Sequence, residues 1–435
     1  MEPGMTARRS TVWPLVLGLT ALACTVWLVF LQFTKYSHHG ISDLPVYEAA
    51  ERQMAAGQLP YRDFPLEYPP AAAGLFWLAG AIPGAFGPAF SALMLVCLLA
   101  TLVGVIATAR VLGASRRRTL GAGLVVALCP LVLGNMVETR FDLLFAAVLA
   151  WTAWAICSKR FAMAWTLIAV GTLVKLLPLA LIPLLLVVHA RHRGARRAAV
   201  GLAASLGGLA AAVAPFAIMS PRGTWGIVSY HLDRPLQIES TGASYIEVIM
   251  GLVGRTVSVT NSFGSQGLPG HGPSVVAAIS TALLGLAIVL IAATVWFLLR
   301  RVRLDEAAQV TFAGLAATVG ALLVFGKVLS PQFLIWLLPV AFLVSGRFGR
   351  VAFAAALAAM ILTLVYFPYQ YWDLVAMDGL PVAQVAVRNA LLMVFLAAAW
   401  PRPVAPPGAT LVTPGRTTLA KNAPESAFSA RFLID

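Results

Sequence analysis

The sequence predicts an all-α, polytopic membrane protein of about twelve transmembrane helices, with short helices in the loops on one side. Two features of its composition favour this class: 60% of the 435 residues are hydrophobic, and only 11% are charged. Soluble domains carry about 25% charged residues, so little sequence remains for a separate soluble domain. The third observation is that clusters of Arg and Lys recur between apolar runs long enough to cross a bilayer.

The basic clusters set the expected orientation. Arg and Lys concentrate on the cytoplasmic side of membrane proteins, so both termini and the loops that hold the clusters are predicted to be cytoplasmic. With this assignment, 21 of the 31 Lys and Arg residues lie inside and 12 of the 17 acidic residues lie outside. The net charge of +14 therefore reflects topology, not nucleic-acid binding. The spans are expected at residues 11–33, 88–110, 119–135, 141–157, 161–174, 176–188, 198–219, 275–299, 307–326, 332–346, 351–367 and 383–400.

One transmembrane domain is expected over residues 1–400, with long outer loops at 34–87 and 220–274. Residues 401–435 are rich in Pro, Ala, Thr and Ser, which predicts a disordered cytoplasmic tail. The four cysteines all lie inside apolar runs, so we expect core or lipid-facing thiols and not disulfides or metal ligands. The protein is thus expected in the cell membrane, with membrane lipids among its partners.

The apolar run at residues 161–188 is interrupted only by Lys175. A single helix of this length would extend about 42 Å, beyond the ~30 Å hydrocarbon core, and would place Arg160 and Arg191 on opposite sides. Two short helices that meet near Lys175 satisfy both constraints and leave a cavity within the membrane. Residues 71–82 are similarly expected to form a partial helix that dips into the outer leaflet.

The first outer loop is the most informative polar stretch. Asp43 precedes Pro45, and a short helix is predicted over residues 46–56, with Gly57 suited to its end. Asp43 has two interpretations. It is either an N-cap, worth about 1 kcal/mol to the helix, or a catalytic carboxylate held at the bilayer edge.

Four further polar groups of residues fall on the same predicted face, each with an ordinary structural alternative. Residues 138–142 are either a functional turn or a solvated turn with a local ion pair, whose last residue opens the next helix. Lys175 either binds a phosphate or extends to the membrane interface. Residues 229–240 and 327–333 are either binding segments or plain interfacial turns.

Several well-known motifs are absent. The sequence has no GxxxxGK[ST] loop, no GxGxxG after a strand, and no HExxH, GxSxG, CxxC or Asp-x-Asp. These absences leave a soluble nucleotide-sugar donor and a metal-dependent diphosphate site unsupported, so no metal or cofactor is expected. Cations and hydroxyls can instead neutralise a phosphate, while a carboxylate can deprotonate an acceptor hydroxyl. A site at the membrane edge suits a donor whose phosphate is anchored by a lipid tail.

The first outer loop resembles that of glycosyltransferase family 87, the actinobacterial mannosyltransferases of GT-C membrane architecture that use polyprenol-phosphate-mannose. The resemblance rests on Asp43-Leu44-Pro45-Val46-Tyr47, Gly57-Gln58-Leu59-Pro60-Tyr61 and Glu67-Tyr68-Pro69-Pro70. Further motifs follow in the order expected for the family: Arg140-Phe141-Asp142, Lys175 within LVKLLP, the run from Arg234 to Ser240, and Lys327 to Phe333. The similarity extends over nearly the whole chain apart from the tail.

The resemblance implies an inverting transfer of mannose from a polyprenyl-phosphate-sugar donor to a lipid-linked or cell-envelope glycan acceptor on the extracytoplasmic face. It implies that Asp43 is the general base. We expect Lys175, Arg234, His231 and Lys327 to bind the donor phosphate, and the sugars to contact Tyr47, Tyr61, Tyr68, Glu239 and Gln332. The alternative function is a secondary transporter or lipid flippase, whose charges are expected at the bilayer midplane and not at one edge. A purely structural membrane subunit leaves the acidic outer loops unexplained.

Overall fold

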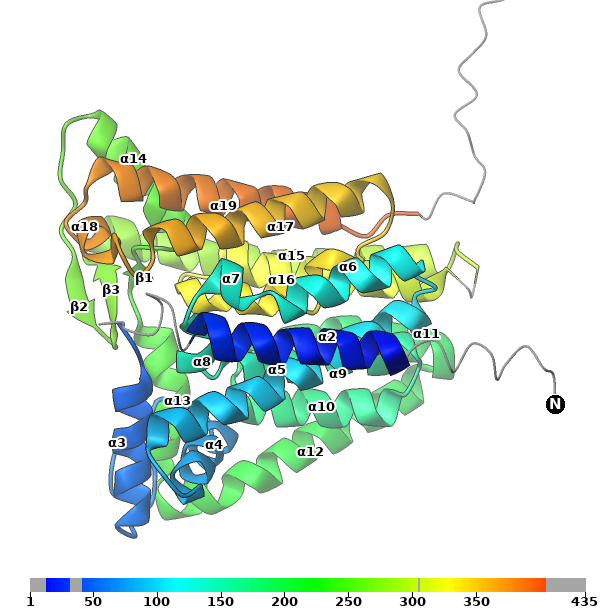
Figure 1. Ribbon diagram of the computed structural model, residues 1–435, viewed down its shortest axis with the longest axis horizontal. Coiled ribbons are helices and arrows are strands. Elements are labelled where there is room, and N and C mark those ends of the chain that lie inside the picture. Colours follow the sequence, from blue (N-terminus) through cyan, green and yellow to red (C-terminus); the bar gives the residue numbers. More distant parts are fainter. Residues whose placement is uncertain (1–12, 32–40, 304–305, 404–435) are drawn as a thin grey trace, which may run out of the picture.

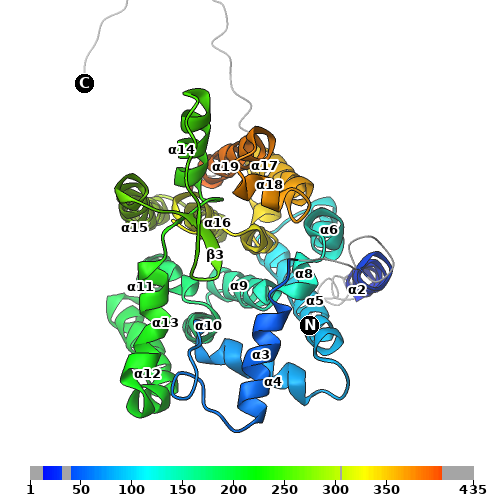
Figure 2. The same ribbon diagram turned by 90° about the vertical axis from the view of Figure 1, so that its left-hand side faces the viewer.

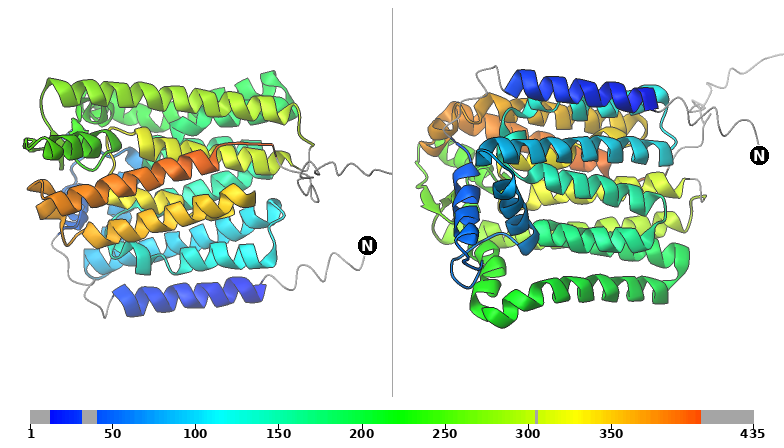
Figure 3. Two further views of the ribbon diagram at one scale, coloured as in Figure 1. Left: turned by 90° about the horizontal axis from the view of Figure 1, so that it is seen from above. Right: turned by 60° about the horizontal axis from the view of Figure 1, so that its bottom comes forward.

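The computed structural model describes residues 13–31, 41–303 and 306–403, which form a bundle of roughly parallel helices (Figures 1 and 3). Within the described ranges, six helices are long and apolar enough to cross a membrane: α5 (Phe86–Val111), α12 (Ala195–Met219), α15 (His271–Leu299), α16 (Ala307–Phe325), α17 (Gly346–Tyr366) and α19 (Gly379–Ala399). Shorter helices complete the bundle: α2 (Trp13–Val26) with η1 (Trp27–Leu31), α6 (Arg116–Ala127), α7 (Pro130–Leu133), α9 (Asp142–Cys157), α10 (Phe161–Val174), η3 (Leu177–Leu181), α11 (Ile182–Arg193), η4 (Pro331–Leu337) and η5 (Ala341–Leu343). Every predicted span coincides with one of these helices or with two in succession, and the all-α class is confirmed.

The predicted break at Lys175 is present. Helix α10 ends at Val174, Lys175 adopts an extended backbone (φ −157°, ψ 135°), and the 3₁₀ helix η3 follows. Pro178, the second residue of η3, lacks an N–H and cannot continue the α-helical hydrogen-bond ladder. Pro331 begins a second 3₁₀ stretch, η4, in the same way. The two irregular segments bring polar residues to one end of the bundle.

That end is covered by short elements (Figures 1 and 2). Three antiparallel strands form a small sheet in the order β1-β3-β2, with Leu236 paired to Leu268; hydropathy patterns gave no sign of this sheet. The elements at this end are α3 (Leu44–Ala55), α4 (Pro70–Ala81), α8 (Met136–Thr139), α13 (Pro221–Asp233), β1 (Leu236–Gln237), α14 (Thr241–Leu252), β2 (Thr260–Ser262), β3 (Ser265–Leu268) and α18 (Tyr371–Val375). Short helices in the long loops at 34–87 and 220–274, including a helix at the expected residues 71–82, are thus confirmed.

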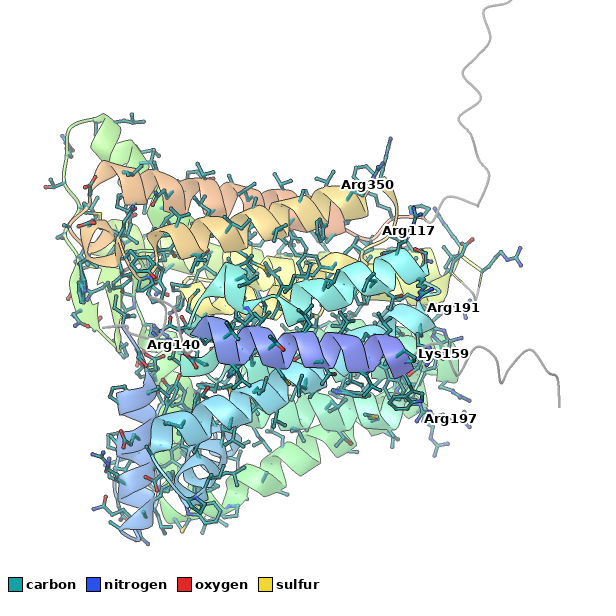
Figure 4. All side chains as sticks on the ribbon, in the orientation of Figure 1. Arg117, Arg140, Lys159, Arg191, Arg197 and Arg350 are labelled. Atoms are coloured by element: carbon teal, nitrogen blue, oxygen red, sulfur yellow. The ribbon has the colours of Figure 1, made fainter. Side chains whose placement is uncertain are left out.

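The opposite end of the bundle carries the basic clusters. Figure 4 shows Arg117, Lys159, Arg191, Arg197 and Arg350 at this end, while Arg140 lies at the end covered by short elements. The two ends therefore differ in charge as expected from the sequence. The four cysteines are free thiols. The predicted disordered tail lies, from residue 404 onward, outside the described residues.

Candidate active site

Asp43 lies directly before α3, but its side chain does not cap the helix. The α3 helix begins at Leu44, and no backbone N–H of its first turn donates to the Asp43 carboxylate. The carboxylate instead forms an ion pair with Arg140, and its Oδ2 accepts a hydrogen bond from the Tyr47 hydroxyl at 3.2 Å. The N-cap interpretation of Asp43 is therefore wrong. The carboxylate remains one-third exposed, at 33%, and can contact a substrate.

Aromatic rings of the first loop pack beside Asp43. Tyr47 stacks on Phe76 with ring centroids 4.5 Å apart, and the ring of Tyr68 lies edge-on to Tyr47 at 5.7 Å. Tyr61 has a different role, because its hydroxyl donates to the Tyr68 carbonyl at 2.6 Å and its ring packs against Phe216. Tyr47 thus contacts the carboxylate and packs against Tyr68, while Tyr61 braces the loop. Tyr47 and Tyr61 are buried, so the expected direct sugar contact is not supported for them, while sugar binding by the half-buried Tyr68 stays a prediction.

Two charged residues of the 138–142 turn pair with distant partners. Asp142 is buried and accepts hydrogen bonds from Lys175 Nζ at 2.5 Å and from Trp336 Nε1 at 2.7 Å. The Lys175 ammonium also lies 4.7–5.0 Å from the ring centroids of Phe141, Phe333 and Trp336. Arg140 pairs with Asp43, and Asp142 pairs with Lys175. The alternative of a local ion pair within residues 138–142 is therefore wrong. So is the interpretation of Lys175 as a side chain that extends to the interface.

Cations gather around His231 at the end of α13. Burial, and after it the positive charges of Arg234, Lys175 and Lys327, lower the pKa of His231 to about 4. The Arg234 guanidinium lies over the Tyr230 ring, and its buried Nε has no hydrogen-bond partner among the described residues. Lys327 Nζ donates to the Leu232 carbonyl at 2.6 Å. Of the three cations only Lys175 forms an ion pair with a described acid, so the cluster has positive charge available for an anion.

Gln237 joins two motifs that are far apart in the sequence. Its Nε2 donates to Ser330 Oγ at 3.2 Å, and its Oε1 accepts a hydrogen bond from the Leu329 N–H at 3.0 Å. The Gln237 N–H donates to the Lys327 carbonyl at 3.0 Å. These bonds hold Lys327 next to the segment that carries Arg234. Gln332 lies in η4 beside Phe333 and is half-buried, so its contact with an acceptor stays a prediction.

A family model described as Glycosyltransferase family 87 matches residues 66–326, which is more than half of the chain. The chain belongs to glycosyltransferase family 87. Its match spans Arg140, Asp142, Lys175 and Arg234 but begins after Asp43, so the role of Asp43 depends on the geometry described above. The apo structure of ArnT from Cupriavidus metallidurans is similar to this protein at 15% sequence identity, over 90% of this chain and 77% of that chain, with a TM-score of 0.46. No match to a curated protein was found.

Family membership identifies this protein as a membrane glycosyltransferase and sets aside the transporter or flippase alternative. A membrane enzyme of this kind takes a lipid-linked sugar donor and a glycan acceptor. Within the described part of this family 87 chain, no group of three or more His, Cys, Asp or Glu side chains suits a metal ion.

Glu239 of this family 87 enzyme is enclosed by protein groups. The residue is buried, and its carboxylate accepts hydrogen bonds from the Tyr366 hydroxyl at 2.6 Å and from Gln237 Nε2 at 3.1 Å. Its backbone carbonyl accepts from Arg388 at 2.9 Å and from Asn389 at 3.2 Å. Burial raises the pKa of Glu239 to about 7, although Arg388 opposes the shift. The expected direct sugar contact is not supported, because Glu239 organises the loop from within.

Several polar residues of this network were not among the predicted site residues. Arg388 and Asn389 lie in α19 and are fully buried, as is Tyr366 at the end of α17. The carboxylate of Glu247 in α14 is also buried, both of its oxygens lack a hydrogen-bond partner among the described residues, and burial raises its pKa to about 8. Ionisable side chains inside an apolar helix are a signal that could have identified Arg388, since they are costly unless paired.

Proposed function

We propose that this family 87 enzyme transfers mannose from a polyprenyl-phosphate-mannose donor to a hydroxyl of a lipid-linked or cell-envelope glycan, with inversion to an α-mannoside. The observation that carries the proposal is that a partly exposed carboxylate, Asp43, lies at the same end of the bundle as the cation cluster of Lys175, Arg234 and Lys327 around His231. A carboxylate can accept the acceptor proton, and cations stabilise a departing phosphate.

The proposed chemistry follows from these two groups. Asp43 takes the proton of the acceptor hydroxyl as its oxygen attacks the anomeric carbon of mannose. The bond between that carbon and the phosphate oxygen breaks, and polyprenyl phosphate leaves with the electron pair. Arg234 is the best-placed ligand for this phosphate, because its buried Nε has no protein partner among the described residues. An N–H donor aimed at a charged oxygen gives a hydrogen bond about twice as strong as a neutral one.

The partners of the reactive groups have supporting roles in this proposal. Arg140 is buried and paired with Asp43, so it holds the carboxylate in one position. Asp142 holds the Lys175 side chain in place through their ion pair, and Trp336 fixes Asp142 in turn. The half-buried ring of Tyr68, which packs against Tyr47, offers a stacking surface for a sugar. The cation cluster is thus pre-organised before the donor arrives.

We further propose that the end with Asp43 faces the outside of the cell and that both termini are cytoplasmic. The supporting observation is the basic end of the bundle opposite Asp43 (Figure 4). A single cysteine placed at Gly57, in a background without the four native cysteines, tests this orientation. Labelling of position 57 by a membrane-impermeant reagent in intact cells is expected. Labelling of position 57 only after the cells are permeabilised contradicts the proposed topology.

The function is tested with purified protein, polyprenyl-phosphate-[³H]mannose and a panel of membrane glycolipids. We expect radiolabelled product that an α-mannosidase digests, and no product from GDP-mannose in place of the lipid donor. Polyprenyl-phosphate-glucose serves as the control for sugar specificity. Transfer from the soluble nucleotide sugar, or from the glucose donor alone, would refute the proposed donor while leaving the family assignment intact.

A further inference from the structure

A groove of about 770 Å³ runs along the flank of the bundle between α10, α11 and α12. At one end it is lined by Lys159, Arg193 and Arg197, which belong to the basic end of the molecule, where Figure 4 labels Lys159 and Arg197. Further along, the lining is apolar and includes Val170 and Leu173. The groove is therefore amphipathic along its length. Its apolar part approaches the active-site end, and its cations lie at the far end.

Small residues of α12 create the hollow. The Ser205 hydroxyl donates to the Trp165 carbonyl of α10 at 2.9 Å, and a Cβ atom on Gly201 would lie 2.3 Å from the Trp165 indole nitrogen. The two helices thus touch at these residues. Ala204 and Gly208 line the groove beside this contact, and a Cβ atom on Gly208 would meet nothing within 4 Å. The groove is open space held between packed helices.

The wall of the groove near the basic end is held together by a hydrogen bond and a ring stack. The Trp165 indole N–H donates to His189 Nδ1 at 3.0 Å, and the His189 ring stacks on Phe161 with centroids 4.2 Å apart. A neutral imidazole whose Nδ1 accepts a hydrogen bond carries its proton on Nε2. His189 therefore adds a neutral donor to the same part of the groove that holds the three cations.

The cations of the groove have no acidic counterpart. The sequence contains no Asp or Glu between Asp142 and Asp233, so none of the three helices around the groove carries an acid. Among the residues that the structure describes, Lys159, Arg193 and Arg197 form no ion pair. Few residues in the apolar stretch of α12 are buried in the bundle, so its outward side is left for lipid beside the groove. Positive charge beside open apolar space at a membrane edge attracts an anionic lipid.

We propose that this groove binds one anionic phospholipid of the leaflet at the basic end, with its phosphate at Lys159, Arg193 and Arg197 and an acyl chain along α10 and α12. The length agrees, because the 14 residues of α10 extend about 20 Å and one leaflet of hydrocarbon is about 15 Å thick. A polyprenyl tail from the active site is the less suitable occupant. Its phosphate would lie at the opposite end and would leave the three cations without a partner.

The test measures binding of phosphatidylglycerol and of phosphatidylcholine with the same acyl chains to purified full-length protein, by native mass spectrometry and by thermal stabilisation in detergent. Arg193→Ala/Arg197→Ala removes two headgroup contacts. Arg196→Ala/Arg116→Ala is the matched control, because both residues are exposed at the same end and neither lines the groove. All four arginines are exposed, so both variants are expected to fold, which size-exclusion chromatography checks.

We expect the protein to prefer phosphatidylglycerol over phosphatidylcholine by about tenfold or more, and the Arg193/Arg197 variant to bind it about 30-fold more weakly, with the control unchanged. Gly208→Leu, which fills the apolar part, is expected to weaken binding of the same lipid. Equal binding of both lipids, or an equal loss in the control variant, overturns the proposal. Polyprenyl phosphate is the last test ligand. If it displaces phosphatidylglycerol, and if Gly208→Leu but not the Arg193/Arg197 variant weakens its binding, the proposal is also overturned, because the groove would then hold the donor tail.

Discussion

Replacement of Asp43 by Asn separates catalysis from structure in this enzyme. The Asp43 side chain caps no N–H of α3, so the substitution removes no helix cap. The Asn amide oxygen can take the place of Oδ1 beside Arg140, and the Asn amide nitrogen, in the place of Oδ2, can donate a hydrogen bond to the Tyr47 hydroxyl. What is lost is the negative charge beside the buried Arg140, and a hydrogen bond to a charged group is worth about 1.5–3 kcal/mol. We therefore expect a folded protein with modestly lower thermal stability.

Activity should fall much further than stability. Loss of a positioned general base typically costs ~10²–10⁴-fold in rate, which is about 2.7–5.4 kcal/mol of transition-state free energy. The assay is mannosyl transfer at saturating donor, together with donor binding at equilibrium. Donor affinity should change little, because Asp43 does not belong to the cation cluster.

Tyr47→Phe is the matched control for this prediction. It removes the 3.2 Å hydrogen bond to Asp43 but keeps the ring stacked on Phe76, so a rate loss of less than about tenfold is expected. If Asp43→Asn turns over at a near-normal rate, the base assignment is refuted. If Tyr47→Phe is as inactive as Asp43→Asn, orientation of the carboxylate outweighs its proton transfer.

Three further predictions concern the cation cluster. Arg234→Gln should weaken donor binding, measured by donor titration, by about 10–150-fold. The control variant Arg222→Gln, at an exposed position of the same loop, should bind the donor normally. Lys175→Ala should destabilise the fold by about 3–5 kcal/mol, because it leaves the buried Asp142 carboxylate without its cation. The second substitution Asp142→Asn in that variant should recover part of the melting temperature. The free protein keeps His231 neutral because its pKa is about 4, and a bound phosphate raises that pKa, so donor affinity should increase as pH falls from 7 toward 5. His231→Asn should remove this slope. If donor affinity still increases at lower pH in His231→Asn, another group takes up the proton when the donor binds.

The polar network of the site shows the limit of local reasoning. Residues 138–142 contain Arg140 and Asp142 only two positions apart, and local sequence favours pairing between neighbours. The structure instead pairs Arg140 with Asp43 and Asp142 with Lys175. An ion in an apolar environment takes whichever partner the fold brings to it, and the helices that bring these partners are separated by long stretches of chain. Arg388 also finds a distant partner, since its guanidinium donates to the backbone carbonyl of Glu239, 149 positions away.

Local sequence was enough to predict the helical class, the positions of the apolar helices, the break at Lys175 and the position of Asp43 in the first long polar loop. Each of these follows from local constraints: an apolar run must be helical in lipid, its length is set by the bilayer, and basic loops set its orientation. Only the tertiary structure decided which helices are neighbours, and with them the ion pairs, the cation cluster around His231 and the flank groove of α10 and α12. The physical reason is that lipid-exposed helices are apolar on most faces, so hydropathy does not say which face meets which partner.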